Sequence, residues 1–175
     1  MIYVLDNKTK TASLSSGRHV EGEYNIPSEL DYGGQTFTLT SIKYPAFAFN
    51  TSLTSVIIPR SVTNVGNAVF YLCSNLTDVY CYAENVPETG IDVFKDCPIA
   101  SATLHVPAGS VDLYKTASPW KEFGKIVALT TTLVNSILNG QPYVSNQSYF
   151  DLQGRRLADK PVRGIYIEDG KKKVK

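Results

Sequence analysis

Enzymes and metal sites depend on residue types that are scarce in this sequence. Its 175 residues include two histidines, three cysteines, one tryptophan and one methionine. Neither His19 nor His105 belongs to a His-Glu-x-x-His pattern, and no Gly-x-Ser-x-Gly or phosphate-binding Gly-Lys-Ser/Thr motif occurs. The cysteines also lack the close paired spacing of zinc ligands. We therefore expect a protein that is not an enzyme and that uses no cofactor and no metal.

Long apolar runs and an excess of charge are missing as well. No run approaches the roughly 18 apolar residues that span a bilayer, so no membrane span is expected. The formal net charge is +1, which gives no field to attract nucleic acid. No basic and apolar leader precedes Tyr3, so a signal for export is expected to lie outside the printed sequence.

The middle of the chain repeats itself at a fixed step. The repeat pairs Phe47 with Phe70, Leu53 with Leu76, and Val56 with Val79, each 23 residues apart. A third pass begins at Phe94 and ends in the run 104–107, the counterpart of 56–59. A period in the twenties is typical of a solenoid, whose units are too small to bury an apolar face alone. The alternative, a β-sandwich of unrelated strands, does not explain apolar positions that recur in register.

Each coil of the expected solenoid contributes one short strand to a parallel sheet, with strands about 4.8 Å apart. We expect the strands near 53–58, 76–82 and 102–106, and short helical turns around 46–49, 67–72 and 91–95. The third coil carries an extra residue before its strand, which predicts a bulge there. The expected repeat core comprises Phe47, Leu53, Val56, Ile58, Phe70, Cys73, Leu76, Val79, Cys81, Phe94, Cys97, Leu104 and Val106.

Two of the cysteines occupy the same repeat position. Cys73 and Cys97 stand where the preceding coil has Asn50. They are expected to be two buried thiols on neighbouring coils, although neighbouring coils are also close enough for a disulfide bridge. An odd number of cysteines does not make a disulfide framework.

The segments around the repeats divide into four further units. Residues 1–45 are expected to form an N-terminal β cap of hairpins, and 108–129 a C-terminal cap with a helix at 108–115 and a strand at 125–129. Trp120 is expected to cover the end of the last coil with Tyr114 and Phe123; ligand binding by Trp120 is the alternative. Residues 130–148 are expected to be a linker containing a strand at 132–137. Residues 149–175 are expected to form a small β tail, where eight basic residues face four acidic ones.

The repeat resembles a known family. Leu-x-x-Val-x-Ile-Pro at 53–59 is followed by Ser61-Val62, by Val65-Gly66 and by Ala68-Val69-Phe70-x-x-Cys73. This pattern resembles the BspA-like leucine-rich repeat of bacterial surface proteins, and the resemblance covers about residues 1–129. It implies a β-rich α/β fold, with a short leucine-rich-repeat solenoid, a parallel sheet and caps at both ends. Such repeats are binding scaffolds with many targets, so the resemblance implies a fold more than an activity.

The tail carries a second resemblance. Tyr149-Phe150-Asp151-Leu152-Gln153-Gly154-Arg155, then Gly164-Ile165-Tyr166-Ile167 and a lysine-rich end, is similar to a sorting domain of the type IX secretion pathway of Bacteroidetes. This resemblance implies a cell-surface or secreted protein. The net positive charge of the tail is typical of a solvated segment, and polyanion binding is the alternative.

The strand face of the solenoid that points away from the core is the best candidate for contact. Cys81 is expected to point inward and His105 outward, which argues against a Cys–His nucleophile. The face covers only a few hundred Å², on the order of 15 by 15 Å. We expect a non-enzymatic adhesion module for a protein or glycan, such as host extracellular matrix; the alternative is a structural or oligomerisation module. The candidate ligand-binding residues are Ser55, Ile57, Asp78, Tyr80, Tyr82, Thr103 and His105.

Overall fold

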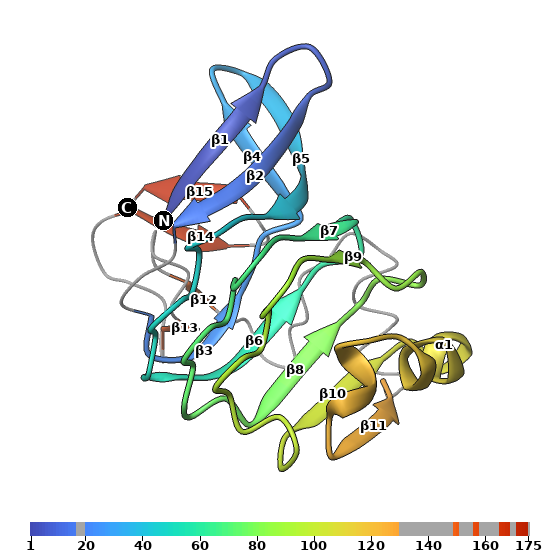
Figure 1. Cartoon of the computed structure of the whole chain (residues 1–175). Helices are drawn as coiled ribbons and strands as arrows, with labels where there is room; N and C mark the ends of the chain where they lie inside the picture. Colours follow the sequence, from blue (N-terminus) through green and yellow to red (C-terminus); the bar gives the residue numbers. More distant parts are fainter. Residues whose placement is uncertain (17–19, 130–148, 151–155, 158–164, 169–170, 175) are drawn as a thin grey trace.

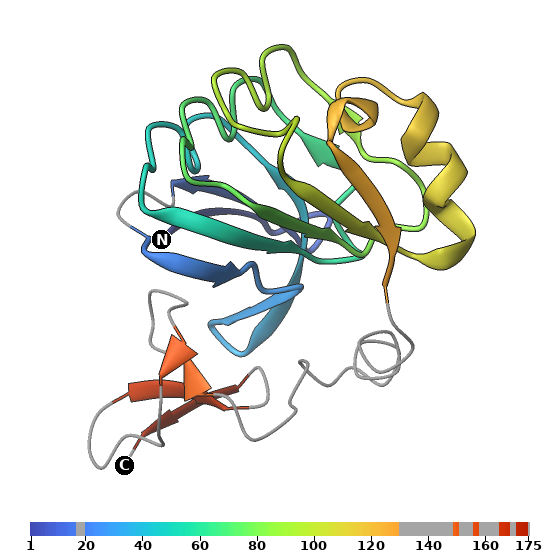
Figure 2. The same ribbon diagram turned by 90° about the horizontal axis from the view of Figure 1, so that it is seen from below.

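The computed structural model describes residues 1–16, 20–129, 149–150, 156–157, 165–168 and 171–174. One strand from each coil joins a parallel sheet, here called the repeat sheet (Figures 1 and 2). Its order is β11-β10-β8-β6-β3, and every neighbouring pair is parallel. Its strands are β3 (Gly22–Asn25), β6 (Leu53–Ile58), β8 (Asp78–Cys81), β10 (Thr103–Val106) and β11 (Lys125–Ala128).

The register of the repeat sheet follows the period of the sequence. Val56 lies opposite Val79, and Val79 lies opposite Leu104. The first step is 23 residues and the second is 25, yet β8 and β10 pair without a register shift. The expected bulge in the third strand is therefore wrong, because loops accommodate the extra residues. The sheet also takes its first strand, β3, from the segment assigned to the N-terminal cap.

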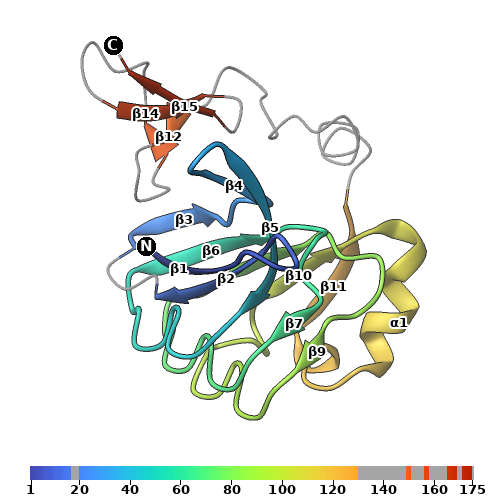
Figure 3. The ribbon, with the colours of Figure 1, turned by 90° about the horizontal axis from the view of Figure 1, so that it is seen from above.

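A second sheet lies on the other side of the coils (Figure 3). In it β2, β5, β7 and β9 pair in parallel, as each coil passes back from the repeat sheet. The antiparallel partners β1 and β4 complete the N-terminal hairpins, which confirms that expectation. The strands are β1 (Ile2–Asp6), β2 (Thr11–Ser16), β4 (Glu29–Tyr32), β5 (Gln35–Ile42), β7 (Asn64–Val65) and β9 (Glu88–Thr89).

Aromatic rings run through the core from one coil to the next. The Phe70 ring is stacked on Phe47 at a centroid distance of 5.3 Å and on Phe94 at 5.2 Å, with interplanar angles of 7° and 3°. Tyr24 packs on Phe47 at the N-terminal end, and Trp120 packs on Phe94 at the other end. Of the expected core residues, all are buried except Cys97, which is partly exposed. Burial of Trp120 confirms that it packs over the last coil.

The segments that precede the strands are not helical. Residues 46–49, 67–72 and 91–95 form turns, so the expectation of short helices there is wrong. Phe49, Leu72 and Asp96 adopt positive φ values of 64°, 58° and 60° at equivalent positions. A left-handed residue interrupts a helix, and neither phenylalanine nor leucine advertises that conformation in a sequence.

The C-terminal cap crosses the end of the last coil. It contains η1 (Ala108–Ser110), the short helix α1 (Val111–Thr116) and η2 (Trp120–Glu122), and then returns as β11. The expected helix at 108–115 is thus a 3₁₀ turn followed by one α-helix. Among the described residues no helix is long and apolar enough to cross a bilayer.

Four strands are described in the tail. They form an antiparallel sheet in the order β13-β12-β14-β15. The expected strand at 132–137 lies outside the described residues. The tail strands are β12 (Tyr149–Phe150), β13 (Arg156–Leu157), β14 (Ile165–Glu168) and β15 (Lys171–Val174).

Candidate functional site

The outer face of the repeat sheet carries two columns of side chains in register. Ile57 lies opposite Tyr80, and Tyr80 lies opposite His105, so one residue from each of three strands forms the first column. The second column has Ser55 opposite Asp78 and Asp78 opposite Thr103. The parallel pairing of equivalent strands therefore brings the predicted residues of these columns together.

His105 is held by two neighbours on β8. Its Nε2 lies 3.0 Å from Oδ1 of Asp78, where the carboxylate accepts a hydrogen bond. Its ring stacks on Tyr80 with a centroid distance of 4.1 Å and an interplanar angle of 9°. The His105 side chain is 20% exposed and that of Asp78 is 36% exposed. Together Asp78, Tyr80 and His105 form a fixed, partly exposed cluster, here called the Tyr–His cluster.

Two residues predicted for this face are not available for contact. Ser55 is 9% exposed and Tyr82 is 7% exposed, so the expectation that they line a contact surface is wrong. The Ser55 hydroxyl has no hydrogen-bond partner among the described residues. The predicted residues that stay partly exposed are Ile57, Asp78, Tyr80, Thr103 and His105.

The C-terminal strand widens the face. Lys125 lies opposite Thr103, and Val127, which is 37% exposed, lies opposite His105. The sequence analysis expected this strand but did not place it beside 102–106. A cap that follows the last coil and ends in a strand is the signal for that placement, because the strand then has a free edge to extend. The face consequently runs from the acidic Asp78 to the basic Lys125.

The thiols lie on the opposite side of the coils and do not meet His105. The Cys97 thiol donates a hydrogen bond to the Phe70 carbonyl at 2.8 Å, and the Cys73 thiol donates to the Phe47 carbonyl at 3.2 Å. Both cysteines are unbridged. The hydrogen bond with Cys97, together with burial, raises the pKa of Cys73, whereas the hydrogen bond with Cys73 lowers the pKa of Cys97. Cys97, which is also more exposed, is therefore the more reactive of the two.

The third cysteine is a core residue, as expected. Cys81 is buried, and its Sγ lies 3.2 Å from the Tyr114 hydroxyl of the C-terminal cap. Burial raises the pKa of Cys81 to about 11 and also raises that of Tyr114. Neither group is charged near neutral pH, so both serve packing between the last coils and the cap.

The described residues offer no catalytic or metal-binding group. They contain no cluster of three or more histidine, cysteine, aspartate or glutamate side chains suited to a metal ion. Within this part of the chain, the recorded contacts of the His105 ring are with Asp78 and Tyr80, and they include no thiol or serine hydroxyl. A histidine–carboxylate pair without a nucleophile lacks the third member that nucleophilic catalysis needs. The arrangement is suited to binding.

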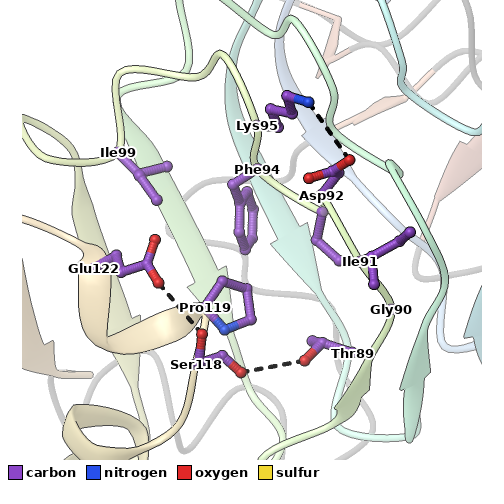
Figure 4. Close-up of a pocket in the computed structure, with 11 residues that line it drawn as sticks. Thr89, Gly90, Ile91, Asp92, Phe94, Lys95, Ile99, Ser118, Pro119 and Glu122 are labelled. Carbon is purple, nitrogen blue, oxygen red and sulfur yellow. Dashed lines mark hydrogen bonds and ion pairs between the residues drawn. The ribbon is translucent and has the colours of Figure 1, made fainter.

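A cavity lies between the last turn and the C-terminal cap (Figure 4). Its volume is about 710 Å³, and Phe94 lies in it with Ile99 and Pro119 on its apolar walls. The Lys95–Asp92 ion pair at 3.7 Å and the Ser118–Glu122 hydrogen bond at 3.3 Å supply polar groups at its border. We call this cavity the end groove.

The sequence analysis missed the end groove. It expected the aromatic residues of the cap to close the last coil, and Trp120 and Phe123 do pack on Phe94. The signal was present in the repeat pattern, because no fourth turn follows the strand at 104–107. A cap that replaces a turn by a different backbone course does not cover the same edge.

The comparisons identify the repeat. Residues 34–114 match the family described as the BspA type leucine-rich repeat region, in six copies. No curated protein matches the chain. A solved structure, a leucine-rich cell surface protein from Faecalibacterium prausnitzii A2-165, is similar at 15% identity with a TM-score of 0.43. That alignment covers 92% of this chain, which spans 60% of the other protein's length. The chain is therefore a BspA-type leucine-rich repeat protein, with its repeat region at residues 34–114.

Proposed function

We propose that this protein is a non-enzymatic binding module that holds a protein or glycan ligand on the outer face of the repeat sheet. The Tyr–His cluster carries this proposal. The Tyr80 and His105 rings are already stacked at 4.1 Å, and the 3.0 Å contact with Asp78 fixes the imidazole. Rings that are ordered before binding lose little conformational entropy when a ligand arrives. Leucine-rich repeats of this kind are typically non-catalytic, which agrees with this function.

The size of the face sets the strength of binding. Five strands at about 4.8 Å spacing make a surface only about 20 Å wide. A standard protein interface covers about 800 Å² on each partner. One face of this size binds weakly, or binds a peptide or a glycan, and gains strength where several copies are displayed together. A host extracellular matrix, with its repeated protein and glycan epitopes, is a ligand of this kind.

The proposed location is the cell surface or the extracellular medium. The support is the resemblance of the repeats to bacterial surface proteins and of residues 149–175 to a sorting domain of the type IX pathway of Bacteroidetes. Binding of a matrix ligand requires such a location. The chain would then consist of the N-terminal cap at 1–45, repeats at 46–107, the C-terminal cap at 108–129, a linker and a sorting tail.

Removal of the Tyr–His cluster is expected to abolish ligand binding. We expect Tyr80→Ala and His105→Ala each to weaken binding about tenfold or more, because each removes half of the stacked pair. The measurement is a pull-down of the full chain on purified host matrix proteins and glycans, followed by a dissociation constant for each ligand retained. Leu113→Ala is the control, since Leu113 is 51% exposed on α1, away from the repeat sheet.

The alternative function is a structural module that joins other copies or a fixed partner. Circular dichroism of each variant first establishes that the fold is intact. Binding that survives both Tyr80→Ala and His105→Ala would contradict the strand face as the site. A parent chain that retains no matrix ligand but sediments as an oligomer would favour the structural alternative.

A further inference from the structure

Consecutive turns of the solenoid are joined by a regular ladder of backbone hydrogen bonds. In each turn, alternate amides donate to carbonyls of the next coil. The first turn donates from Phe47 to Val69 at 3.0 Å and from Phe49 to Tyr71 at 2.7 Å. The second turn donates three times, at 2.9 to 3.0 Å, from Ala68 to Ile91, from Phe70 to Val93 and from Leu72 to Lys95.

The ladder stops at the third turn. Its equivalent amides belong to Asp92, Phe94 and Asp96, and none of them donates to an acceptor among the described residues. The next coil would supply the acceptors, but after β10 the chain turns into η1 and α1 instead of forming a fourth turn. The third turn therefore presents three backbone donors in the pattern that the second turn uses to bind an extended segment.

These donors lie at the end groove. Asp92 and Phe94 line its 710 Å³, and Pro119 and Glu122 of the cap form the facing wall (Figure 4). A volume of this size is in the ordinary range of ligand sites. We propose that the end groove binds an extended peptide, whose carbonyl oxygens accept hydrogen bonds from the amides of Asp92, Phe94 and Asp96.

An extended peptide fits this row of donors better than other ligands do. Carbonyls on one side of an extended chain recur every second residue, as the three amides do. Peptides that add to an exposed backbone edge gain affinity from such main-chain bonds and specificity from pockets for their side chains. Within this chain the segment 91–95, bound along the second turn, is an example of such a ligand.

The cap determines which peptides fit. Where the second turn stacks Phe70 on Phe94, the third turn already has Trp120 and Phe123 packed on the Phe94 ring, at centroid distances of 5.3 and 5.1 Å. A peptide therefore finds no space for an aromatic ring at its central position and must carry a small residue there. Apolar residues on either side meet Ile91, which is 72% exposed, and Ile99.

The proposal is tested by nuclear magnetic resonance on the full isotope-labelled chain. The probes are an acetylated and amidated peptide of residues 88–96 and the same peptide with Phe94→Ala. The alanine peptide is expected to shift the amide signals of Asp92, Phe94 and Asp96 saturably, with a dissociation constant on the order of 1 mM. The phenylalanine peptide is expected to bind at least about threefold more weakly, because its ring has no space.

A pair of variants on η2 separates groove binding from general stickiness. Glu122→Trp places a large side chain over the groove and is expected to weaken binding about tenfold. Lys121→Trp adds the same side chain at the neighbouring exposed position, which does not line the groove, and is expected to leave binding within about twofold. Absence of saturable shifts, equal binding by Glu122→Trp, or shifts centred on Tyr80 and His105 would overturn the proposal. None of these outcomes depends on the strand-face function.

Discussion

Replacing Phe70 with alanine is expected to lower the free energy of unfolding by about 4 kcal/mol. The ring is fully buried and stacked between Phe47 and Phe94, so its removal takes contacts from two neighbouring coils at once. A loss of this size is a large part of the stability of a small domain. The measurement is urea denaturation followed by circular dichroism and by the fluorescence of Trp120, the only tryptophan.

The control for this prediction is Phe49→Ala. Phe49 belongs to the same turn system, but it is 57% exposed and has an edge contact with Tyr71 at 5.3 Å. Its replacement is expected to cost about 1 kcal/mol or less. Equal losses in the two variants would mean that the stacked rings do not couple the coils, and the solenoid account of stability would be wrong.

Gly90→Ala is expected to destabilise the protein by about 3 kcal/mol. Gly90 begins the third turn where it crosses Asn67 of the second coil, and its amide donates to the Val65 carbonyl at 2.8 Å. A Cβ at this position would lie 2.5 Å from the Asn67 amide nitrogen and 2.8 Å from its Cα, and it would also overlap Oδ1. Backbone atoms cannot yield without separating the coils, so the change strains the whole stack.

Gly109→Ala is the matched change at a glycine in η1. A Cβ at Gly109 meets nothing within 4 Å, so the expected change in unfolding free energy is within about 0.5 kcal/mol. Thermal denaturation of both variants, followed by circular dichroism, checks the pair. A Gly90→Ala protein as stable as Gly109→Ala would contradict the close approach of the second and third coils.

The repeat sheet could be predicted because a period of 23 residues fixes which residues lie opposite each other. Val56 and Val79 pair in the structure as their spacing requires. The turns could not be predicted with the same success, because their path depends on left-handed residues. Leucine at position 72 has a φ of 58°, and a sequence usually signals such a position by glycine or asparagine. The hydrogen-bond ladder to the next coil holds Leu72 in this conformation.

The candidate site was predictable to the extent that it follows the repeat. Equivalent positions on neighbouring strands brought Asp78, Tyr80 and His105 together, and their alternation placed them outside the core. Burial of Ser55 and Tyr82 was not predictable, because it depends on segments that flank the strands and do not repeat. The end groove was also missed, since it exists only where the repeat ends and a cap of different course begins.

Amide hydrogen exchange tests most directly that the coils are joined by a backbone ladder which ends at the third turn. The account predicts that Ala68 and Leu72, which donate to the next coil, exchange about 100-fold or more slowly than the equivalent Asp92 and Asp96. Both aspartates are exposed, so burial does not mask the contrast. Equal exchange rates at the four amides would contradict the ladder, and with it the stacked solenoid and the open end groove.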